Sequence, residues 1–267
     1  MVSLERDQDR RRMISQRFPA TSEAIDVVYA VDGRIFDAGN YFSYVTGLYS
    51  TEGVLLSPGE VGCALSHIEA YRRFLASTAS AALFLEDDVC GTDDDIVRIT
   101  GLVEKLKGDF FLCCGGQNGL RSQRWLRGKL RSYGGSMHYE VERNCYRQVW
   151  RTCCYVMSRR VAEEVLKKQL TILRKADDWG ALLKGTKSEV LFWDVLSHPV
   201  EQGTSGIEIE RRQITSQLGN NHRPTWKARI SVLLDKFGLY QSILLATCAA
   251  FSGYERVFRK ASRPNLG

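Results

Sequence analysis

The sequence predicts an α/β fold with a mostly parallel central sheet that is covered by helices. Short, continuous apolar runs at residues 81–85 and 109–114 are typical of strands that are buried on both faces. A strongly capped helix begins at Ser57 and precedes the first of these runs. Helical patterns separate the apolar runs, and strands that alternate with helices favour a parallel sheet.

Local sequence patterns indicate most of the expected strands and helices. Residues 2–4 are expected to form a short first strand, and the arginine-rich residues 7–18 a helix. Residues 25–31 alternate as a strand does and stop at a turn pair, Asp32 and Gly33. Residues 34–56 show no regular pattern. The elements expected farther on are helices at 93–107 and 160–170, a strand at 149–157, loops with a hairpin at 115–147, and a short ambiguous element at 188–195.

The helix after Ser57 is the best specified element. Serine at the N-cap, Pro58 at the first helical position and Glu60 at the third form a capping box with the expected proline. Apolar residues follow at helical spacing from Val61 to Leu75. We therefore interpret Glu60 as a capping residue.

Composition and charge narrow the possible partners. The 267 residues are 44% hydrophobic and 25% charged, which is ordinary for one folded domain with or without an appendage. A formal net charge of +6 favours anionic partners such as nucleotide phosphates, phosphorylated glycans or acidic lipid surfaces. The basic residues lie in no nucleic-acid-binding motif, so we expect no nucleic acid partner.

The eight cysteines and the N-terminus indicate a cytoplasmic protein. The chain has no Cys-x-x-Cys sequence, and adjacent cysteines on a strand point to opposite faces, so neither adjacent pair predicts a disulfide or a zinc clamp. Free thiols suit a reducing cytosol. Residues 1–18 are charged throughout and lack the apolar segment of a signal peptide.

Two parts are predicted: a main domain at residues 1–220 and a basic amphipathic helical tail at residues 221–267. A membrane-spanning helix needs ~20 mostly apolar residues. Three polar residues, Asp235, Lys236 and Gln241, interrupt the apolar stripe of the tail. The stripe either packs on the protein's own core or lies on an anionic membrane surface, and the sequence leaves both alternatives open.

Three acidic residues, Glu86, Asp87 and Asp88, directly follow the buried run at 81–85. Open α/β sheets bind ligands beyond the carboxyl ends of their strands. Side chains alternate along a strand, so Glu86 and Asp88 share one side and Asp87 faces the other. Crowded carboxylates predict a site for Mn²⁺ or Mg²⁺ and a diphosphate, in which one group binds the metal and another binds a ribose hydroxyl or a water on the metal. The alternative is an acidic turn that leads into a solvated helix.

Two segments together resemble glycosyltransferase family 25. They are Leu-Ser-Pro-Gly-Glu-Val-Gly-Cys-Ala-Leu-Ser-His at residues 56–67 and Leu-Phe-Leu-Glu-Asp-Asp-Val at residues 83–89. This family includes bacterial lipooligosaccharide galactosyltransferases and the collagen galactosyltransferases. Residues 3–10, 29–33 and 154–159 are also similar to the family, and the resemblance covers about residues 2–216.

The resemblance implies a GT-A-like domain that binds a nucleotide sugar. It assigns the metal ion to Asp88 with Glu86, and such an ion stabilises the leaving nucleoside diphosphate. Family members that make β-linkages from α-linked donors invert the anomeric carbon, which requires one carboxylate base. Asp178 is the first candidate for this base and Asp177 the second. The alternative for the pair is that it caps a helix at 179–183.

The remaining candidates are expected to bind the nucleotide or the substrate. Arg6 and Arg10 either approach phosphate or uracil or only pair with Asp7 and Asp9. Asp32 either accepts a hydrogen bond from the uridine or only makes the Asp-Gly turn. His67 is either a site residue or a buried structural histidine. The other histidines show no ligand spacing, so His198 receives no role. The candidates are Arg6, Arg10, Asp32, Ser66, His67, Glu86 and Asp87.

Together these observations predict a metal-dependent, inverting hexosyltransferase. We expect it to move galactose from UDP-galactose, in β-linkage, onto a lipooligosaccharide or another lipid-linked saccharide at the cytoplasmic face of the inner membrane. The alternatives are the same fold with another donor such as UDP-glucose and a non-catalytic glycan- or membrane-binding homologue. A nucleotidyltransferase should carry a glycine-rich, lysine-containing phosphate loop near the first strand, and the sequence has none.

Overall fold

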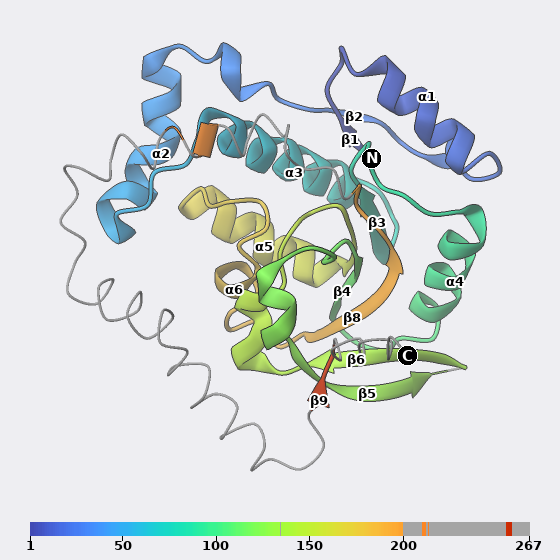
Figure 1. Ribbon diagram of the computed structural model, residues 1–267. Helices are drawn as coiled ribbons and strands as arrows, with labels where there is room; N and C mark the ends of the chain where they lie inside the picture. Colours follow the sequence, from blue (N-terminus) through green and yellow to red (C-terminus); the bar gives the residue numbers. More distant parts are fainter. Residues whose placement is uncertain (134, 200–209, 212, 214–254, 258–267) are drawn as a thin grey trace, which may run out of the picture.

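The computed structural model describes residues 1–133, 135–199, 210–211, 213 and 255–257, and a seven-stranded sheet lies at its centre (Figure 1). The order of the strands in this sheet is β3-β7-β4-β8-β6-β5-β9. The strands are β3 (Ala81–Leu85), β4 (Phe110–Gly115), β5 (Arg127–Tyr133), β6 (Ser136–Val141), β7 (Cys154–Ser158), β8 (Glu189–Leu196) and β9 (Glu255–Arg256).

The fold is mixed α/β, but the prediction of a mostly parallel sheet is wrong. Among the described strands of the large sheet, β4 and β8 form the one parallel pair, and all other neighbours are antiparallel. β3 and β4 run in the same direction, because both pair antiparallel with β7. β7 comes later in the chain and lies between them, and the β5–β6 hairpin adds further antiparallel pairs. Alternation with helices predicts the direction of successive strands, but not which later strand lies between them.

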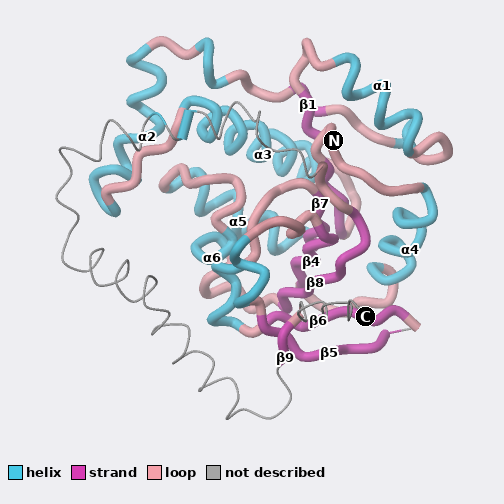
Figure 2. Tube along the Cα trace, viewed as in Figure 1, coloured by secondary structure: helices cyan, strands magenta, loops and turns pink. Residues whose placement is uncertain are grey.

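Helices cover both faces of the large sheet (Figure 2). Helices α3, α5 and α6 pack against one face, in a core cluster that includes Tyr71 and Trp179. Helices α1 and α4 cover the other face, in a cluster that includes Ile99. Cys113 belongs to the first cluster and Cys114 to the second, so these adjacent cysteines point to opposite faces as predicted. The helices are α1 (Gln8–Arg17), α2 (Ala38–Glu52), α3 (Pro58–Ala76), α4 (Asp93–Val103), α5 (Arg159–Thr171) and α6 (Trp179–Leu182).

Helix α2 lies in a segment that was expected to be irregular. Its N-cap is Asp37, whose carboxylate accepts a hydrogen bond from the Asn40 backbone N–H at 2.8 Å. It ends at Gly53, which adopts the left-handed conformation with φ 70°. Both capping signals are present in the sequence, but the aromatic residues between them hide the apolar period. Val45 and Leu48 face the core from this helix.

The capping box of α3 is confirmed. The Ser57 hydroxyl accepts a hydrogen bond from the Glu60 backbone N–H at 3.2 Å, and the Glu60 carboxylate accepts one from the Ser57 N–H at 2.8 Å. Glu60 is buried, and its carboxylate also pairs with Lys175 at 2.9 Å and with Arg211 at 2.8 Å. These two cations balance a buried charge that the capping box alone would leave uncompensated.

Two short strands connect the N-terminus to the large sheet. β1 (Val2–Ser3) pairs in parallel with β2 (Val28–Tyr29), and Val2 also forms a single parallel bridge with Glu86. The expected short first strand is therefore present, and it runs beside the residues that follow β3. This arrangement brings α1 close to the acidic triplet.

Most of the predicted tail lies outside the described residues, including its expected amphipathic helices. Residues 255–257 are described, and β9 pairs antiparallel with β5 there. No helix in the described part of the chain is long and apolar enough to cross a membrane.

The α3 cap provides a test of the fold. Ser57→Ala removes a fully buried hydroxyl that accepts a helix N–H, so we expect the free energy of unfolding to fall by about 1 kcal/mol. In urea unfolding, the midpoint should fall while the slope stays unchanged. The control is Ser43→Ala at an exposed position of α2, which should change stability by less than ~0.5 kcal/mol. Equal midpoints for the wild type and Ser57→Ala would contradict a stabilising cap.

Candidate functional site

A pocket of about 690 Å³ lies where β1, α1, the end of β2, the first half of α3 and the residues after β3 meet. Pockets for small ligands typically measure ~300–1,000 Å³. Of the ten predicted site residues, Asp177 and Asp178 are absent from its lining. The eight that line it are Arg6, Arg10, Asp32, Ser66, His67, Glu86, Asp87 and Asp88.

Tight backbone packing fixes one wall of this pocket. A Cβ atom at Gly62 of α3 would lie 2.5 Å from the carbonyl oxygen of Val31, and one at Gly33 would lie 1.7 Å from the carbonyl oxygen of Pro58. Neither position therefore has room for a side chain. The close approach places α3 against the turn that follows β2.

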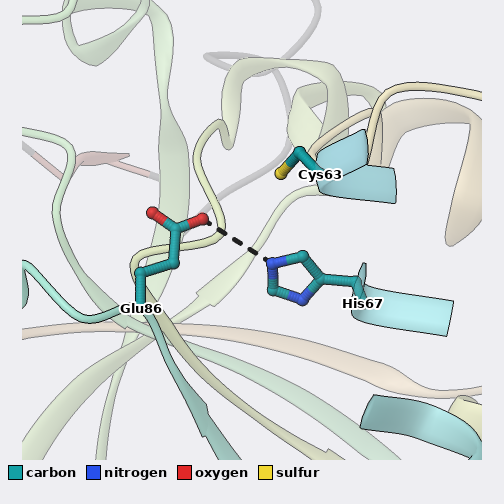
Figure 3. Close-up of side chains that lie close together, drawn as sticks. All are labelled: Cys63, His67 and Glu86. Atoms are coloured by element: carbon teal, nitrogen blue, oxygen red, sulfur yellow. Dashed lines mark ion pairs between the residues drawn. The ribbon is translucent and has the colours of Figure 1, made fainter. Parts of the chain in front are cut away.

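Helix α3 contributes His67 and Cys63 to the pocket (Figure 3). The imidazole of His67 is 1% exposed, and its Nδ1 lies 2.6 Å from the Tyr155 hydroxyl. Its Nε2 is buried without a hydrogen-bond partner among the described residues and lies 3.6 Å from Glu86 Oε1. His67 therefore combines both alternatives from the sequence: the ring is buried and hydrogen-bonded, yet one nitrogen faces the pocket.

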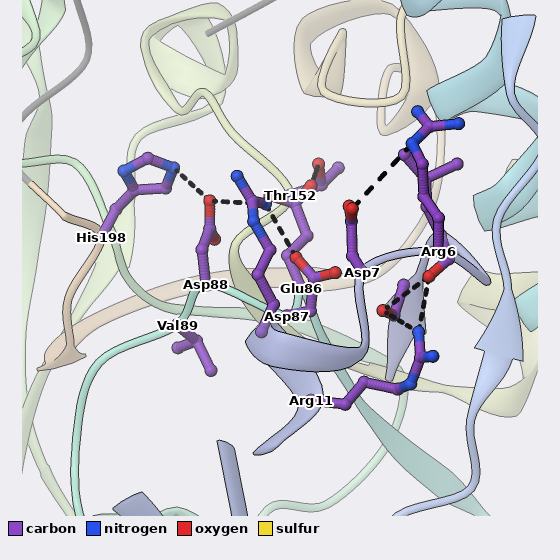
Figure 4. A network of polar contacts seen from close by, with 12 residues as sticks. Arg6, Asp7, Arg11, Glu86, Asp87, Asp88, Val89, Thr152 and His198 are labelled. Atoms are coloured by element: carbon purple, nitrogen blue, oxygen red, sulfur yellow. Dashed lines mark hydrogen bonds and ion pairs between the residues drawn. The ribbon is translucent and has the colours of Figure 1, made fainter. Parts of the chain in front are cut away.

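The acidic triplet divides between separate partners (Figure 4). The Glu86 carboxylate accepts a hydrogen bond from the Thr152 hydroxyl. Asp88 lies beside His198, with 3.4 Å between Asp88 Oδ2 and His198 Nε2. Asp87 is 6% exposed and accepts a hydrogen bond from Arg10 at 2.9 Å. Three neighbouring carboxylates are thus held by three different elements of the fold.

The Asp88 carboxyl has a lowered pKa and, among the described residues, one oxygen without a hydrogen-bond partner. Burial by itself raises the pKa of its carboxyl, but the hydrogen bond to His198 and the charges of His198 and Arg10 bring the pKa below its usual value. Its Oδ1 is buried and has no hydrogen-bond partner among the described residues. The hydrogen bond to Asp88 likewise raises the pKa of His198 against the effect of burial. One carboxylate oxygen therefore remains available for a ligand.

His198 is a site residue that the sequence did not indicate. It lies far along the chain from Asp88, just after β8. An isolated antiparallel bridge between Cys90 and Ser197 brings the two segments together. Ligand atoms of Glu86, Asp88 and His198 all lie within 4.8 Å of one another, a separation that a single metal ion can span. No local spacing could have revealed this group, because pairing between distant segments creates it.

The arginines of α1 hold the triplet in place. Arg10 donates to Asp87 and lies 3.8 Å from Asp88, so it pairs with aspartates as one alternative held, but Asp9 pairs with Arg12 instead. Burial raises the pKa of Asp87, although hydrogen bonds from Ser3 and Arg10 oppose the shift. The guanidinium of Arg10 therefore compensates a crowded group of negative charges.

Asp32 and Ser66 make local contacts in another part of the pocket lining. Arg6 pairs with Asp32, whose carboxylate also accepts hydrogen bonds from the Arg34 backbone N–H at 3.2 Å and from its Nε at 3.0 Å. Asp32 thereby caps the short helix η2 (Gly33–Ile35), as a turn residue does. The Ser66 hydroxyl donates to a carbonyl one helical turn earlier at 2.6 Å and accepts from the Val31 N–H at 2.8 Å. Ser66 thus fastens α3 to the end of β2.

Asp177 and Asp178 have different surroundings. Asp178 is the N-cap of α6: its carboxylate accepts from the Ala181 N–H at 3.3 Å and pairs with Arg174 at 3.3 Å. Asp177 accepts from the Arg151 N–H at 3.0 Å. Burial raises the pKa of Asp177, and the negative charge of Glu86 adds to the shift. The capping alternative therefore describes Asp178, whereas Asp177 lies within electrostatic range of the pocket.

Arg151 holds this region together through an uncommon backbone conformation. Its φ of 66° lies in the left-handed region, which is unusual for a residue other than glycine. Its N–H binds Asp177, its carbonyl oxygen accepts from Trp179 Nε1 at 3.1 Å, and its guanidinium binds the carbonyl oxygens of Gly116 and Asn118. The next residue, Thr152, binds Glu86. Strained backbone of this kind clusters at functional sites, and no local pattern in the sequence indicates it.

Comparisons with known proteins found a family match and a similarity to a solved structure. Residues 1–179 match a family model that is described as glycosyltransferase family 25, LPS biosynthesis protein. Among solved structures, the chain is similar to mannose-1-phosphate geranyltransferase from Thermus thermophilus, at 15% identity and a TM-score of 0.31. That match covers 52% of this chain and 52% of the other, so the chain matches about half the length of that protein. No curated protein matches.

Asp177 provides a pH-dependent test of the site. Burial holds its pKa above the value of ~3.9 in the unfolded chain, so its contribution to stability is present below that value and is lost as pH rises through the folded pKa. Asp177→Asn cannot ionise and can still accept from the Arg151 N–H. We expect the variant to be more stable than the wild type near pH 7 and the difference to vanish toward pH 4.

Urea midpoints at the two pH values measure this difference. The control is the exposed Asp94→Asn of α4, which should change stability by less than ~0.5 kcal/mol at either pH. A variant that is less stable than the wild type near pH 7 would show that the charged carboxylate is stabilising.

Proposed function

The chain belongs to glycosyltransferase family 25, and from this premise we propose that it transfers a hexose from a UDP-sugar to a saccharide acceptor with the help of a divalent metal ion. One observation supports this most directly: a single pocket is lined by residues of both family segments, Cys63, Ser66 and His67 from the first and the acidic triplet from the second. The proposal includes a GT-A-like arrangement of the nucleotide-sugar site.

The residues at Asp88 fit a metal ion. Two carboxylates and one imidazole lie within reach of a shared ion, and Asp88 Oδ1 is buried and, among the described residues, without a hydrogen-bond partner. Mg²⁺ prefers oxygen ligands, so a set that includes His198 is better suited to Mn²⁺. We therefore propose Asp88, Glu86 and His198 as the ligands. When bound, the ion would supply positive charge for the diphosphate as it leaves.

The arginines in the pocket supply the other charges that a nucleoside diphosphate requires. Arg6, Arg10 and Arg34 line the pocket, and their aspartate partners leave them partly exposed, with 50 to 53% of each side chain accessible. Arginine forms bidentate hydrogen bonds with phosphate oxygens. In the proposed complex these side chains orient the diphosphate, and Asp32 accepts a hydrogen bond from the uridine.

For the base we propose Asp177 in preference to Asp178. In an inverting transfer, the acceptor oxygen forms a bond to the anomeric carbon while the bond from that carbon to the diphosphate oxygen breaks. UDP leaves with the bonding electrons, and a carboxylate takes the proton of the acceptor hydroxyl. A raised pKa makes Asp177 a stronger base, whereas the Asp178 carboxylate is occupied by the α6 cap and Arg174. This proposal reverses the order expected from the sequence, in which Asp178 came first.

Donor and acceptor follow from the family resemblance. We propose galactose as the sugar, a β-linkage, and a lipooligosaccharide or related lipid-linked saccharide as the acceptor. The family is described as one of LPS biosynthesis, which supports such an acceptor. We further propose that the protein works at the cytoplasmic face of the membrane, where its net positive charge favours an anionic lipid surface. The tail, which we predicted to lie either on such a surface or on the core, falls mostly outside the described residues.

UDP release from a panel of UDP-sugars tests the metal-dependent reaction. Wild type should release UDP with Mn²⁺, lose this activity with EDTA and favour one sugar. Asp88→Asn should lower turnover by ~100-fold or more, because it removes a charged metal ligand while the side chain keeps its size and shape. The control Asp94→Asn should retain wild-type turnover. Preference for UDP-glucose would replace galactose in the proposal. No turnover and no metal-dependent UDP binding by folded protein would favour the non-catalytic binding homologue.

The two neighbouring aspartates are separated by matched variants. Asp177→Asn should lower turnover by ~10²–10⁴-fold, the usual contribution of a general base. Asp178→Asn should keep most of the activity, because asparagine caps a helix as well as aspartate does. Turnover is measured with saturating Mn²⁺ and the preferred donor. Loss of activity in Asp178→Asn but not in Asp177→Asn would return the base to Asp178.

A further inference from the structure

The proposed Mn²⁺ set does not account for Cys63 and His67, which lie next to Glu86 (Figure 3). Cys63 and His67 are four residues apart on α3, so they project from the same face of the helix. Glu86 faces them from the end of β3. A ligand atom from each of the three lies within 4.8 Å of the other two, and the three side chains point toward one shared space.

The second observation is the unpaired nitrogen of His67. The side chain is 1% exposed, and Nε2 has no hydrogen-bond partner among the described residues. Its nearest carboxylate oxygen, Glu86 Oε1, lies at 3.6 Å, which is too far for a hydrogen bond. A buried, unpaired polar atom is unfavourable and requires an explanation. This nitrogen points toward the two other potential ligands.

Hydrogen bonds from outside the cluster fix two of the three side chains. A histidine that binds a metal usually has its other ring nitrogen fixed by a hydrogen bond. The Tyr155 hydroxyl occupies that position for His67, and it is held in turn by the Tyr71 hydroxyl at 2.9 Å. The Thr152 hydroxyl similarly fixes Glu86. Partners outside the cluster therefore orient two of the three potential ligands.

We propose that Cys63, His67 and Glu86 form a second cation site, which takes a thiophilic divalent ion such as Zn²⁺. Sulfur, nitrogen and carboxylate oxygen are the ligands of Zn²⁺, at distances of ~2.0–2.3 Å, and three protein ligands leave one position open. On binding, the Cys63 thiol releases its proton to solvent, and the thiolate sulfur donates an electron pair to the ion. In the absence of a cation, burial and the negative charges of Glu86 and Asp177 raise the pKa of Cys63 and keep the thiol neutral.

The sharing of Glu86 has a functional consequence. Glu86 belongs to this site and to the set with Asp88 and His198, so Zn²⁺ at Cys63 withdraws a ligand from the Mn²⁺ position. Zn²⁺ therefore inhibits the Mn²⁺-supported reaction. This consequence rests on the proposed function, whereas the binding of Zn²⁺ does not.

Cobalt titration tests the site directly. Co²⁺ replaces Zn²⁺ in such sites, and a thiolate ligand gives a sulfur-to-cobalt charge-transfer band in the near ultraviolet. When Co²⁺ is added to metal-free wild type, this band should appear. It should be absent when Co²⁺ is added to Cys63→Ser. Cys90→Ser should keep it, because Cys90 is a partly exposed cysteine outside the pocket lining. Absence of the band in wild type, or its persistence in Cys63→Ser, would overturn the site.

Two further measurements complete the test. X-ray absorption of Zn²⁺-loaded wild type needs no variant to fold, and it should show one sulfur ligand at ~2.3 Å; a shell without sulfur would overturn the site. In the UDP-release assay, Cys63→Ser should require ~10-fold or more Zn²⁺ for half inhibition. If Zn²⁺ inhibits Cys63→Ser as strongly as it inhibits the wild type, the proposed inhibition through the shared Glu86 is wrong. If no turnover is found under any condition, the proposed function fails, while the cobalt band still decides the site.

Discussion

The site depends on the close contact between the N-terminal half of α3 and the turn that follows β2. Backbone atoms approach so closely at Gly62 and Gly33 that a Cβ atom at either position would overlap backbone atoms of the other segment. The capping box fixes where the helix begins, and the hydroxyl of Ser66 bonds to the Val31 N–H. Because α3 is anchored at these points, one of its faces is held against the end of β3. The acidic triplet therefore meets His67 and Cys63 in one pocket.

Around this contact, the protein concentrates negative charge and compensates it from distant parts of the chain. Arg10 comes from α1, His198 follows β8, and Thr152 precedes β7. Each binds a different carboxylate, so none of the three acidic side chains rotates freely. Crowded carboxylates that are held in this way attract cations while remaining fixed in position. Contacts that fix charged side chains in this way are the kind of preorganisation from which a transferase site benefits.

Asp177 and Asp178 show how neighbouring residues of one type acquire different properties. The Asp178 carboxylate faces the first turn of α6, accepts the Ala181 N–H group and pairs with Arg174. The Asp177 carboxylate faces inward, to the backbone of Arg151 and the charge of Glu86. Arg151, whose φ of 66° is unusual, donates its backbone N–H to Asp177. The difference between the two therefore arises from a distant backbone segment, although they are adjacent in sequence.

Local signals determined much of this protein from the sequence alone. The capping box at Ser57, the buried strands and the position of Glu86 to Asp88 after β3 all depend on residues within one turn or one strand, and such short-range physics can be read directly. The predicted candidates also include eight residues that line one pocket. Only the tertiary structure decided that β7 lies between β3 and β4, that His198 joins Asp88, and that Asp177 rather than Asp178 faces inward. These outcomes depend on pairing between distant segments, where the free energy comes from contacts that local sequence patterns do not encode.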